Sequence, residues 1–310
     1  YKRQLGTRTA SRPGKPATML DINREGFNIV GLDLSNAGAF VGVVTDLAGT
    51  VIERADVDIS QAQGDDAVVA VETLLDDLVA LARRPVIGVG VGSPGIVDDY
   101  GVVLSAPNLD WRNVPLQARL AEACGLPVAV ANDANAAVVG EFSFGVGQPD
   151  MMLVRIGRGV GSGLMIDGSI VGGARHAAGE IGHLVSGDDD GEPCVCGNRG
   201  CLERWLAIPR IEAHLADPSA DHDAVLTEAG RRLGLVLAPI ASALTLTEVV
   251  LAGPADHISG PLLAAADSTV RDRTLADTHG DMRMRVTELG HDLVVLGAIV
   301  LVLRGQLGVT

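Results

Sequence analysis

The first patterned part of the chain alternates short apolar segments with turn-forming residues. The apolar segments occupy residues 28–34, 39–44 and 51–59, and Gly, Asn and Asp separate them. This pattern predicts three strands arranged as a meander. Residues 65–83 then carry apolar side chains at helical spacing, which predicts an amphipathic helix.

The rest of the chain continues this alternation of strands and helices. A buried strand is predicted over residues 86–91, ahead of the turn Ser93-Pro94-Gly95. Further helices are predicted over residues 116–124, 134–144, 224–244, 261–275 and 292–304, and further strands over residues 128–131, 151–156, 162–166, 169–171, 248–251 and 284–286. Two similar α/β halves result, and a cleft between two such lobes is a common place for a small ligand.

Composition agrees with an α/β fold. Of the 310 residues, 47% are hydrophobic, 39 are Gly and only 3% are aromatic, a balance that suits buried parallel strands and tight turns. The longest apolar run, residues 293–303, is shorter than the roughly 20 residues that cross a bilayer. Residues 1–15 are basic and polar, unlike a secretory signal. We therefore expect a cytoplasmic protein without a membrane segment.

Charge is unevenly distributed between a leader and the body of the chain. The first fifteen residues contain no acid and five bases, which are Lys2, Arg3, Arg8, Arg12 and Lys15. Without these five, 19 of the 24 basic residues remain against 39 acidic ones, so the body has a net charge of about −20. Such a body repels a phosphate backbone, so nucleic-acid binding is not expected from it. The leader could approach DNA, or it could be an ordinary solvated tail.

The strongest local motif is a cluster of cysteines with one histidine. Cys194, Cys196 and Cys201 lie within eight residues, and His183 precedes them by eleven. One His and three Cys complete a tetrahedral zinc shell, so we expect a structural site with no open position. A disulfide is the rival interpretation, but a C-x-C bridge is strained and the expected compartment is reducing. Cys124 is interpreted as a small core residue.

Two acids and an Asn-Asp pair lie where they could contact a ligand. Glu180 precedes His183 by three residues, and Glu203 follows the last cysteine by two. Carboxylates beside a cleft suit the recognition of a polyol, although both could be solvated loop residues. Asn132 and Asp133 end a predicted strand and begin a helix, a position at which an acid could act as a general base. Either residue could instead cap the helix.

A glycine-rich loop joins two of the predicted strands. It reads Gly157-Arg158-Gly159-Val160-Gly161 and continues with Ser162-Gly163. Loops of this kind can bring backbone N–H groups to a phosphate. A tight β-turn explains the glycines equally well.

Together these features resemble the ROK family of repressors, open reading frames and kinases, from about Arg12 onwards. The matching strings, in chain order, are S-P-G-I-V-D, N-D-A-N, G-E-I-G-H and C-x-C-G-x-x-G-C-L-E. The resemblance implies a two-lobed, actin-like ATPase fold with an inserted zinc loop, assembled as a homodimer or homotetramer. In ROK kinases the residue matching Asp133 is the base that activates the sugar hydroxyl. The resemblance places a hexose between the lobes, on Gly95, Asn108, Asn132, Asp133, Glu180, His183 and Glu203.

The chain departs from the ROK kinases in its nucleotide loops. The family's D-x-G-G-T loop is here Asp33-Leu34-Ser35-Asn36-Ala37, so both glycines and the hydroxyl are replaced. The family's G-T-G-x-G loop keeps Gly157, Gly159 and Gly161 but has Arg158 in place of Thr, and the third segment is Leu251-Ala252-Gly253-Pro254. These changes predict that ATP and Mg²⁺ are not cofactors. The cofactor expected from the His183 and cysteine motif is Zn²⁺.

A retained sugar site without nucleotide loops predicts a sensor. We expect the sugar-binding effector domain of a ROK transcriptional regulator, a repressor of carbohydrate genes, with an ATP-dependent hexose kinase as the alternative. Residues 12–18 are similar to the stretch that joins the DNA-binding wing of ROK repressors to the sugar domain. Operator DNA is therefore expected to bind through a winged helix-turn-helix ahead of Tyr1, absent from this chain. The expected parts are a leader (1–18), a small lobe (19–131 with about 291–310) and a large lobe (132–290) that contains the zinc loop (183–201).

Overall fold

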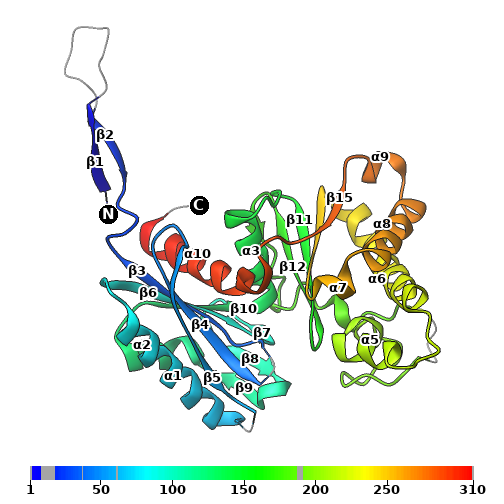
Figure 1. Cartoon of the computed structure of the whole chain (residues 1–310), viewed down its shortest axis with the longest axis horizontal. Helices are drawn as coiled ribbons and strands as arrows, with labels where there is room; N and C mark the ends of the chain where they lie inside the picture. The colour runs from blue at the N-terminus through cyan, green and yellow to red at the C-terminus, as the bar shows by residue number, and fades with distance from the viewer. Residues whose placement is uncertain (1, 8–17, 37, 61, 187–190, 309–310) are drawn as a thin grey trace.

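Two five-stranded sheets and the helices around them form the computed structural model (Figure 1). The structure describes residues 2–7, 18–36, 38–60, 62–186 and 191–308. Both sheets are mixed, because each contains parallel and antiparallel pairs. This arrangement confirms the expected α/β class.

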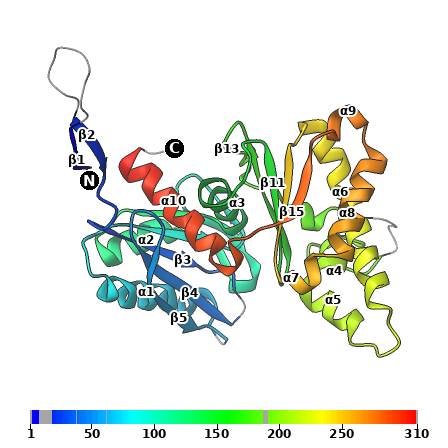
Figure 2. The ribbon, with the colours of Figure 1, turned by 45° about the horizontal axis from the view of Figure 1, so that its top comes forward.

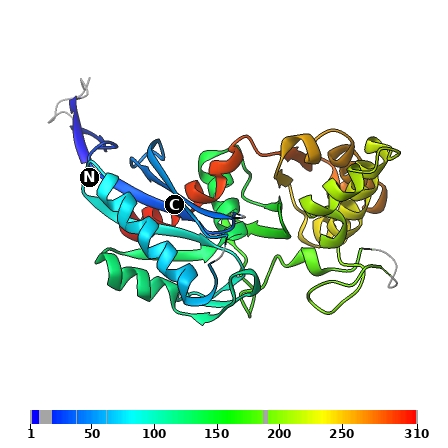
Figure 3. The ribbon, with the colours of Figure 1, turned by 60° about the horizontal axis from the view of Figure 1, so that its bottom comes forward.

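The first sheet is built from β3 (Asn28–Asp33), β4 (Ala39–Thr45), β5 (Val51–Asp58), β6 (Val86–Ser93) and β10 (Val128–Asn132), in the order β10-β6-β3-β4-β5. The antiparallel pairs β3–β4 and β4–β5 confirm the predicted meander. Helices α1 (Gly64–Leu81) and α2 (Leu116–Cys124) cover one face, and α10 (Leu293–Leu307) covers the other (Figure 3). Strand β3 is buried on both faces, since Val30 and Leu32 pack towards α1 and Ile29 packs towards α10.

The second sheet is built from β11 (Met151–Ile156), β12 (Val160–Ile166), β13 (Ser169–Ile170), β14 (Glu248–Ala252) and β15 (Arg283–Val286), in the order β13-β12-β11-β14-β15. One face packs against α3 (Asp133–Phe144), and the other packs against α6 (His222–Leu244) and α8 (Pro261–Arg273). Alternate residues of β11 serve the two faces: Met151 and Leu153 lie with α3, whereas Met152 and Val154 lie with α6 and α8.

Helices α3 and α10 cross in the layer between the two sheets (Figure 2). Their backbones come very close at glycines, because a Cβ on Gly297 would lie 1.7 Å from the carbonyl oxygen of Ala136. A Cβ on Gly90 of β6 would likewise lie 2.0 Å from the carbonyl oxygen of Ala298. By length and composition alone, Gly290–Leu307 could cross a membrane. Ten of the fifteen residues of α10 are buried against the rest of the protein, however, so this helix belongs to the core.

Several elements were not predicted. A small sheet of β7 (Ile96–Val97), β8 (Val103–Ala106) and β9 (Trp111–Val114) extends the first lobe, and the Trp111 indole N–H donates to the Gly64 carbonyl at 2.8 Å. Short 3-10 turns lie at Pro107–Leu109, Ile181–His183 and Gly290–Asp292. The other unpredicted helices are α4 (Glu203–Leu206), α5 (Ile208–Leu215), α7 (Ala255–Ile258) and α9 (Ala276–His279).

The N-terminal leader contains regular structure. Strands β1 (Lys2–Thr7) and β2 (Thr18–Ile22) form an antiparallel hairpin that projects away from both large sheets (Figures 1 and 2). The leader therefore differs from a plain solvated tail at these residues. The stretch predicted to resemble a ROK linker falls mainly on residues 8–17, which lie outside the described residues, as do Ala37 and residues 187–190 of the predicted zinc loop.

Candidate functional site

Asn132 caps the helix that carries Asp133. Its Oδ1 accepts hydrogen bonds from the backbone N–H groups of Ala134 (2.9 Å) and Asn135 (3.0 Å), which otherwise lack partners at a helix start. Its Nδ2 donates to the Gly95 carbonyl at 2.8 Å and to Oδ1 of Asp133 at 3.1 Å. The capping interpretation of Asn132 is confirmed. The same contacts fix the turn at Gly95 beside the start of α3.

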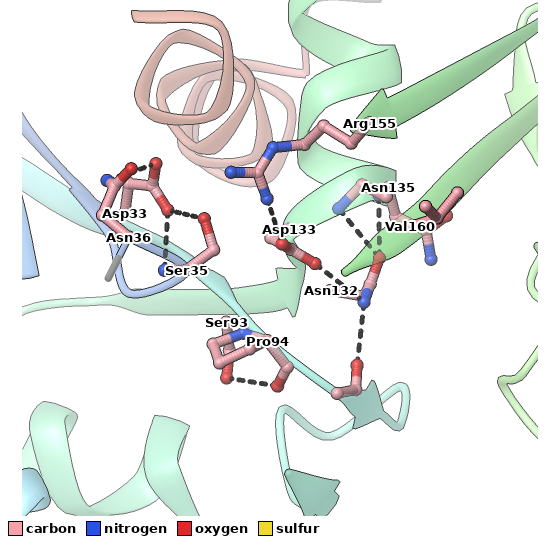
Figure 4. Close-up of polar contacts among 12 residues, drawn as sticks. Asp33, Ser35, Asn36, Ser93, Pro94, Asn132, Asp133, Asn135, Arg155 and Val160 are labelled. Carbon is pink, nitrogen blue, oxygen red and sulfur yellow. Dashed lines mark hydrogen bonds and ion pairs between the residues drawn. The ribbon is translucent and has the colours of Figure 1, made fainter. Parts of the chain in front are cut away.

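Asp133 occupies the first position of α3, and its carboxylate is paired. Oδ2 of Asp133 accepts from Nη1 of Arg155, which reaches it from β11 (Figure 4). The Asp133 side chain is only 16% exposed. Burial raises the pKa of Asp133, the charge of Arg155 opposes that rise, and the nearby Asp33 adds to it. A buried carboxyl with a raised pKa has the character of a general base, but this one is already engaged by a cation.

Asp33 lies buried at the end of β3, and the loop behind it turns back onto its carboxylate. Oδ1 accepts from the backbone N–H of Ser35 at 2.9 Å and from the Ser35 hydroxyl, while Oδ2 accepts from Nδ2 of Asn36 at 3.0 Å (Figure 4). Both carboxylate oxygens therefore have partners within three residues. The replaced residues of the first nucleotide loop make these contacts.

The glycine-rich loop is a tight turn between β11 and β12, as the simpler interpretation proposed. Ile156 pairs with Val160, and the Gly157 N–H donates to the Gly159 carbonyl at 2.9 Å. The Val160 N–H donates to Oε2 of Glu203 at 3.0 Å. A Cβ on Gly159 would lie 2.6 Å from that same oxygen, so glycine is needed here for Glu203 to approach the turn.

Glu180 is held near Asp133 and Glu203 by a turn that requires glycine. Its neighbour Gly179 has φ +97°, and a Cβ there would lie 2.1 Å from the Ser162 carbonyl oxygen. Glu180 is the exposed member of the group, yet partial burial of its carboxyl raises its pKa. Asp133 and Glu203 raise the pKa of Glu180 further, and His183 lowers it. Four of the predicted sugar-site residues therefore interact electrostatically.

The other two predicted sugar-site positions differ from each other. Gly95 has φ +82°, and a Cβ would lie 2.1 Å from the Ser105 carbonyl, so only glycine fits this turn beside Asn132. Asn108 lies exposed in the 3-10 turn Pro107–Leu109. Among the described residues, no hydrogen bond joins its side chain to Asp133 or Glu180.

The predicted metal ligands converge. The ligand atoms of His183, Cys194, Cys196 and Cys201 all lie within 4.8 Å of one another. The Cys194 Sγ to His183 Nδ1 distance and the Cys196 Sγ to Cys201 Sγ distance are both 3.6 Å. Ligands about 2.3 Å from a tetrahedral zinc lie about 3.8 Å apart, so the spacing fits a metal and is far too long for a disulfide of about 2.05 Å.

The protein environment shifts the pKa values of these thiols in opposite directions. Burial, followed by the two neighbouring thiols, raises the pKa of Cys201 to about 12. The Asn198 backbone N–H lowers the pKa of Cys196. Metal ligation needs thiolates, and a divalent cation both favours their ionisation and removes their mutual repulsion. The donor set of three sulfurs and one imidazole nitrogen suits zinc.

Arg232 of α6 anchors the segment that carries His183 and the cysteines, a role that was not predicted. The guanidinium of Arg232 lies 3.7 Å from the centre of the Trp205 ring, and its Nη1 donates to the Ser186 carbonyl at 3.1 Å. Arg232 thereby joins residues on both sides of the metal ligands. Arg155 was missed in the same way, although one signal was available: it is the single charged residue in an otherwise apolar strand.

Comparison with known proteins gives one family. The model of the ROK family matches residues 30–305. The chain is 30% identical to a glucokinase of Halalkalibacterium halodurans, covering 86% of this chain and 92% of the glucokinase. It is 26% identical to a xylose repressor of Caldicellulosiruptor bescii, covering 96% of this chain and 83% of the repressor.

A solved structure has the same fold. A ROK family transcriptional regulator, described as a homologue of the E. coli MLC protein, superposes with a TM-score of 0.83 at 23% identity. The match covers 93% of this chain and 81% of that regulator. At this identity the likeness supports the fold and not a shared ligand.

Proposed function

The chain belongs to the ROK family, and we propose that it is the sugar-binding effector part of a ROK transcriptional regulator that represses carbohydrate genes. In this proposal a hexose or hexose derivative binds between the lobes and receives no phosphoryl group. The carboxylates of Asp133, Glu180 and Glu203 accept its hydroxyl hydrogens. Gly95, Asn108, Asn132 and His183 complete the proposed contact set.

The observation that carries this proposal is the turn after β3. A nucleotide phosphate needs free backbone N–H groups and room beside them, and its Mg²⁺ needs carboxylate oxygens. Here the Ser35 N–H and both Asp33 carboxylate oxygens are used in hydrogen bonds within the turn. This geometry supports binding of a sugar without ATP.

The N-terminal hairpin gives a second line of support. It projects from the body and carries Lys2 and Arg3 in its first strand. Positive charge on a projecting element suits contact with a DNA backbone, which the acidic body does not favour. In the proposed regulator, operator DNA is bound by a winged helix-turn-helix adjoining this hairpin, in a homodimer or homotetramer.

The His183 and cysteine cluster takes a structural role in the proposal. Four protein ligands fill a tetrahedral shell, which leaves no position for a substrate. Zinc held there would fix the turn that precedes His183 and the helix that follows Cys201. Glu180 and Glu203 lie on these two segments, so the metal would position both acids without contacting the sugar.

Calorimetry with the hexoses D-glucose and D-mannose, beside a coupled assay with ATP and Mg²⁺, tests the proposal. We expect binding of one of these sugars and no turnover, with Asp133→Asn binding more weakly and Arg83→Met, a surface change, binding like the wild type. Turnover on the order of 1–100 s⁻¹ would instead identify a kinase.

The kinase alternative has one specific observation in its favour. Asp133 lies at the start of α3, and burial raises its pKa, as a general base requires. A hexose kinase would need Arg155 to leave this carboxylate and the turn at Asp33 to open for the nucleotide. The assay above distinguishes the two functions directly.

A further inference from the structure

Strand β11 contains a charged residue where the fold provides little water. Its neighbours Val154 and Ile156 are 0% and 2% exposed, and the Arg155 side chain is 24% exposed. A guanidinium in such a place loses much of its hydration, so it needs a partner that compensates. An apolar residue at this position would have a higher strand propensity and would pack better against its neighbours. The reason for an arginine at this position must therefore lie in the groups that its side chain contacts.

That partner is the proposed sugar-binding carboxylate itself. Nη1 of Arg155 donates to Oδ2 of Asp133, so a guanidinium lies beside the acid (Figure 4). In Figure 4 the arginine extends from β11 past Asp133 in the direction of Asp33. Asp33 adds a second negative charge close enough to act on Asp133. One cation thus lies in a region with two buried acids.

We propose that Arg155 is the built-in counter-ion of the cleft, which keeps Asp133 ionised as a hydrogen-bond acceptor for a neutral sugar. The inference rests on the proposed function, and it assigns Arg155 as a positioning residue that acts through Asp133. In an enzyme that uses a metal nucleotide, positive charge arrives with the cofactor. Here the chain supplies the positive charge permanently.

The charges around Asp133 explain why such a counter-ion is needed. Asp33 faces it from β3, Glu180 from the turn before His183, and the Ala134 N–H from its own helix. Burial and the two acids all favour the protonated form of Asp133, and a protonated carboxyl is a poorer acceptor. Arg155 and the helix N–H favour the charged form. Without Arg155, the pKa of Asp133 would therefore rise further.

The same balance indicates the class of ligand. Four acids, Asp33, Asp133, Glu180 and Glu203, lie in this region, and the charge of Arg155 is already engaged by Asp133. A phosphorylated sugar would bring two more negative charges into an acidic cleft. We therefore expect a neutral sugar to bind and its phosphate ester to bind at least about tenfold more weakly, a difference of about 1.4 kcal/mol.

The pH dependence of sugar affinity tests the role of Arg155. D-glucose and D-mannose are titrated into the wild type, Arg155→Met, Arg155→Lys and the control Arg83→Met between pH 6 and pH 8. We expect the affinity of the wild type and of Arg83→Met to change little across this range. The affinity of Arg155→Met should fall by about tenfold as the pH falls, because Asp133 takes up a proton. Arg155→Lys, which keeps the charge, should largely restore the flat profile.

Two results would overturn the inference. One is an Arg155→Met profile parallel to that of the wild type, even at lower affinity, since a merely structural role would weaken binding equally at every pH. The other is tighter binding of glucose 6-phosphate than of glucose by the wild type.

A sugar-independent measurement separates this inference from the proposed function. Thermal unfolding of Asp133→Asn, Arg155→Met and the double variant gives the coupling between the two residues. We expect coupling at pH 8 that shrinks towards pH 5, as Asp133 becomes protonated. No coupling at pH 8 would overturn the inference whatever the sugar result. No binding of either sugar by a wild type that shows the coupling would count against the proposed function instead.

Discussion

Asn132 and Asp133 are adjacent in the chain but have different tasks. The side-chain amide of Asn132 bonds both to the first backbone N–H groups of α3 and to the Gly95 carbonyl. It therefore joins α3 to the turn after β6. Asp133 points its carboxylate at Arg155 instead. The cap therefore sets the direction in which the acid leaves the helix. At the scale of single residues, sugar affinity should therefore depend on Asn132, whose side chain bonds to backbone groups.

Replacing the cap tests this dependence. Asn132→Ala should lower the free energy of unfolding by about 1 kcal/mol, the usual cost of losing a side-chain cap. It should also weaken sugar binding by more than that loss of stability explains, because the Gly95 turn and Asp133 lose their anchor. Denaturant unfolding and calorimetry measure the two effects.

Asp221→Ala is the matched control for this change. Asp221 caps α6 through the Ala224 N–H at 3.2 Å, away from the cleft. The control should lose comparable stability and keep its sugar affinity. Equal loss of affinity in both variants would mean that capping acts only through global stability.

At the scale of elements, the crossing of α3 and α10 fixes how the two sheets face each other. Each helix contacts elements of both halves, since α3 follows a strand of the first sheet and packs on the second. The close backbone approach at Gly297 and Gly140 leaves no space for a side chain. Larger residues would force the helices apart, and interiors resist such overpacking.

A pair of glycine substitutions in α10 tests the crossing. Gly297→Ala should destabilise the protein by about 1–3 kcal/mol, because its Cβ would meet the Ala136 carbonyl oxygen at 1.7 Å. Gly305 lies in the same helix, and a Cβ added there would meet open space, so Gly305→Ala is the matched control. That variant should gain up to about 1 kcal/mol from helix propensity. Thermal unfolding of the two variants measures the contrast, which would vanish if α10 packed loosely.

The metal loop is the second element whose role can be measured. Cys196→Ser should lose the bound metal and lower the melting temperature, and sugar affinity should fall with it, because metal-binding energy is folding energy at such a site. Cys124→Ser is the control, since Cys124 is the cysteine outside the cluster. Metal analysis by mass spectrometry, with calorimetry on the same samples, gives both readouts. Wild-type protein that binds sugar but contains no zinc would contradict the structural role.

At the scale of the whole molecule, charge separates a basic N-terminal leader from an acidic body. The body carries about −20, while the first fifteen residues carry five positive charges and no negative one. Non-specific DNA binding depends on the number of phosphates that cations neutralise, and it falls steeply with salt. Five cations give only a weak contact that the body opposes.

We therefore expect the 310-residue chain to bind DNA weakly and only at low salt. Its dissociation constant at physiological salt should be no tighter than about 10⁻⁵ M, without preference among sequences. Fluorescence anisotropy with two unrelated duplexes, repeated over a salt series, measures this. Tight, sequence-selective binding by this chain would show that operator recognition does not need a separate helix-turn-helix.

A longer form that carries a winged helix-turn-helix should behave differently. It should bind a two-fold symmetric operator with half-sites about one helical turn, or a multiple, apart. The sugar identified by calorimetry should change that affinity by about 1–3 kcal/mol, through closure of the lobes. Gel shifts with and without the sugar measure the coupling, and an operator affinity indifferent to saturating sugar would contradict the sensor role.

The sequence by itself determined most of the elements and the cluster of His183 with three cysteines. Helices such as α2 and strands such as β11 were predicted at their observed bounds. The spacing of apolar residues along a short stretch of chain is enough to indicate such an element. The cysteines and His183 were predicted because their spacing is short and their chemistry specific. The strands of the N-terminal hairpin were not predicted, since that stretch lacks an apolar period and its pairing joins residues well apart in the chain.

Only the tertiary structure decided the electrostatics around Asp133. The contact between Asp133 and Arg155 joins residues that are 22 apart on different elements. Asp33, which raises the pKa of Asp133, lies on a third element, strand β3. The sequence presents Asp133 as a possible base and Arg155 as an ordinary strand residue. A carboxylate becomes a base or a fixed acceptor according to which charges and how much water surround it. Those surroundings exist only after both sheets have packed against α3 and α10.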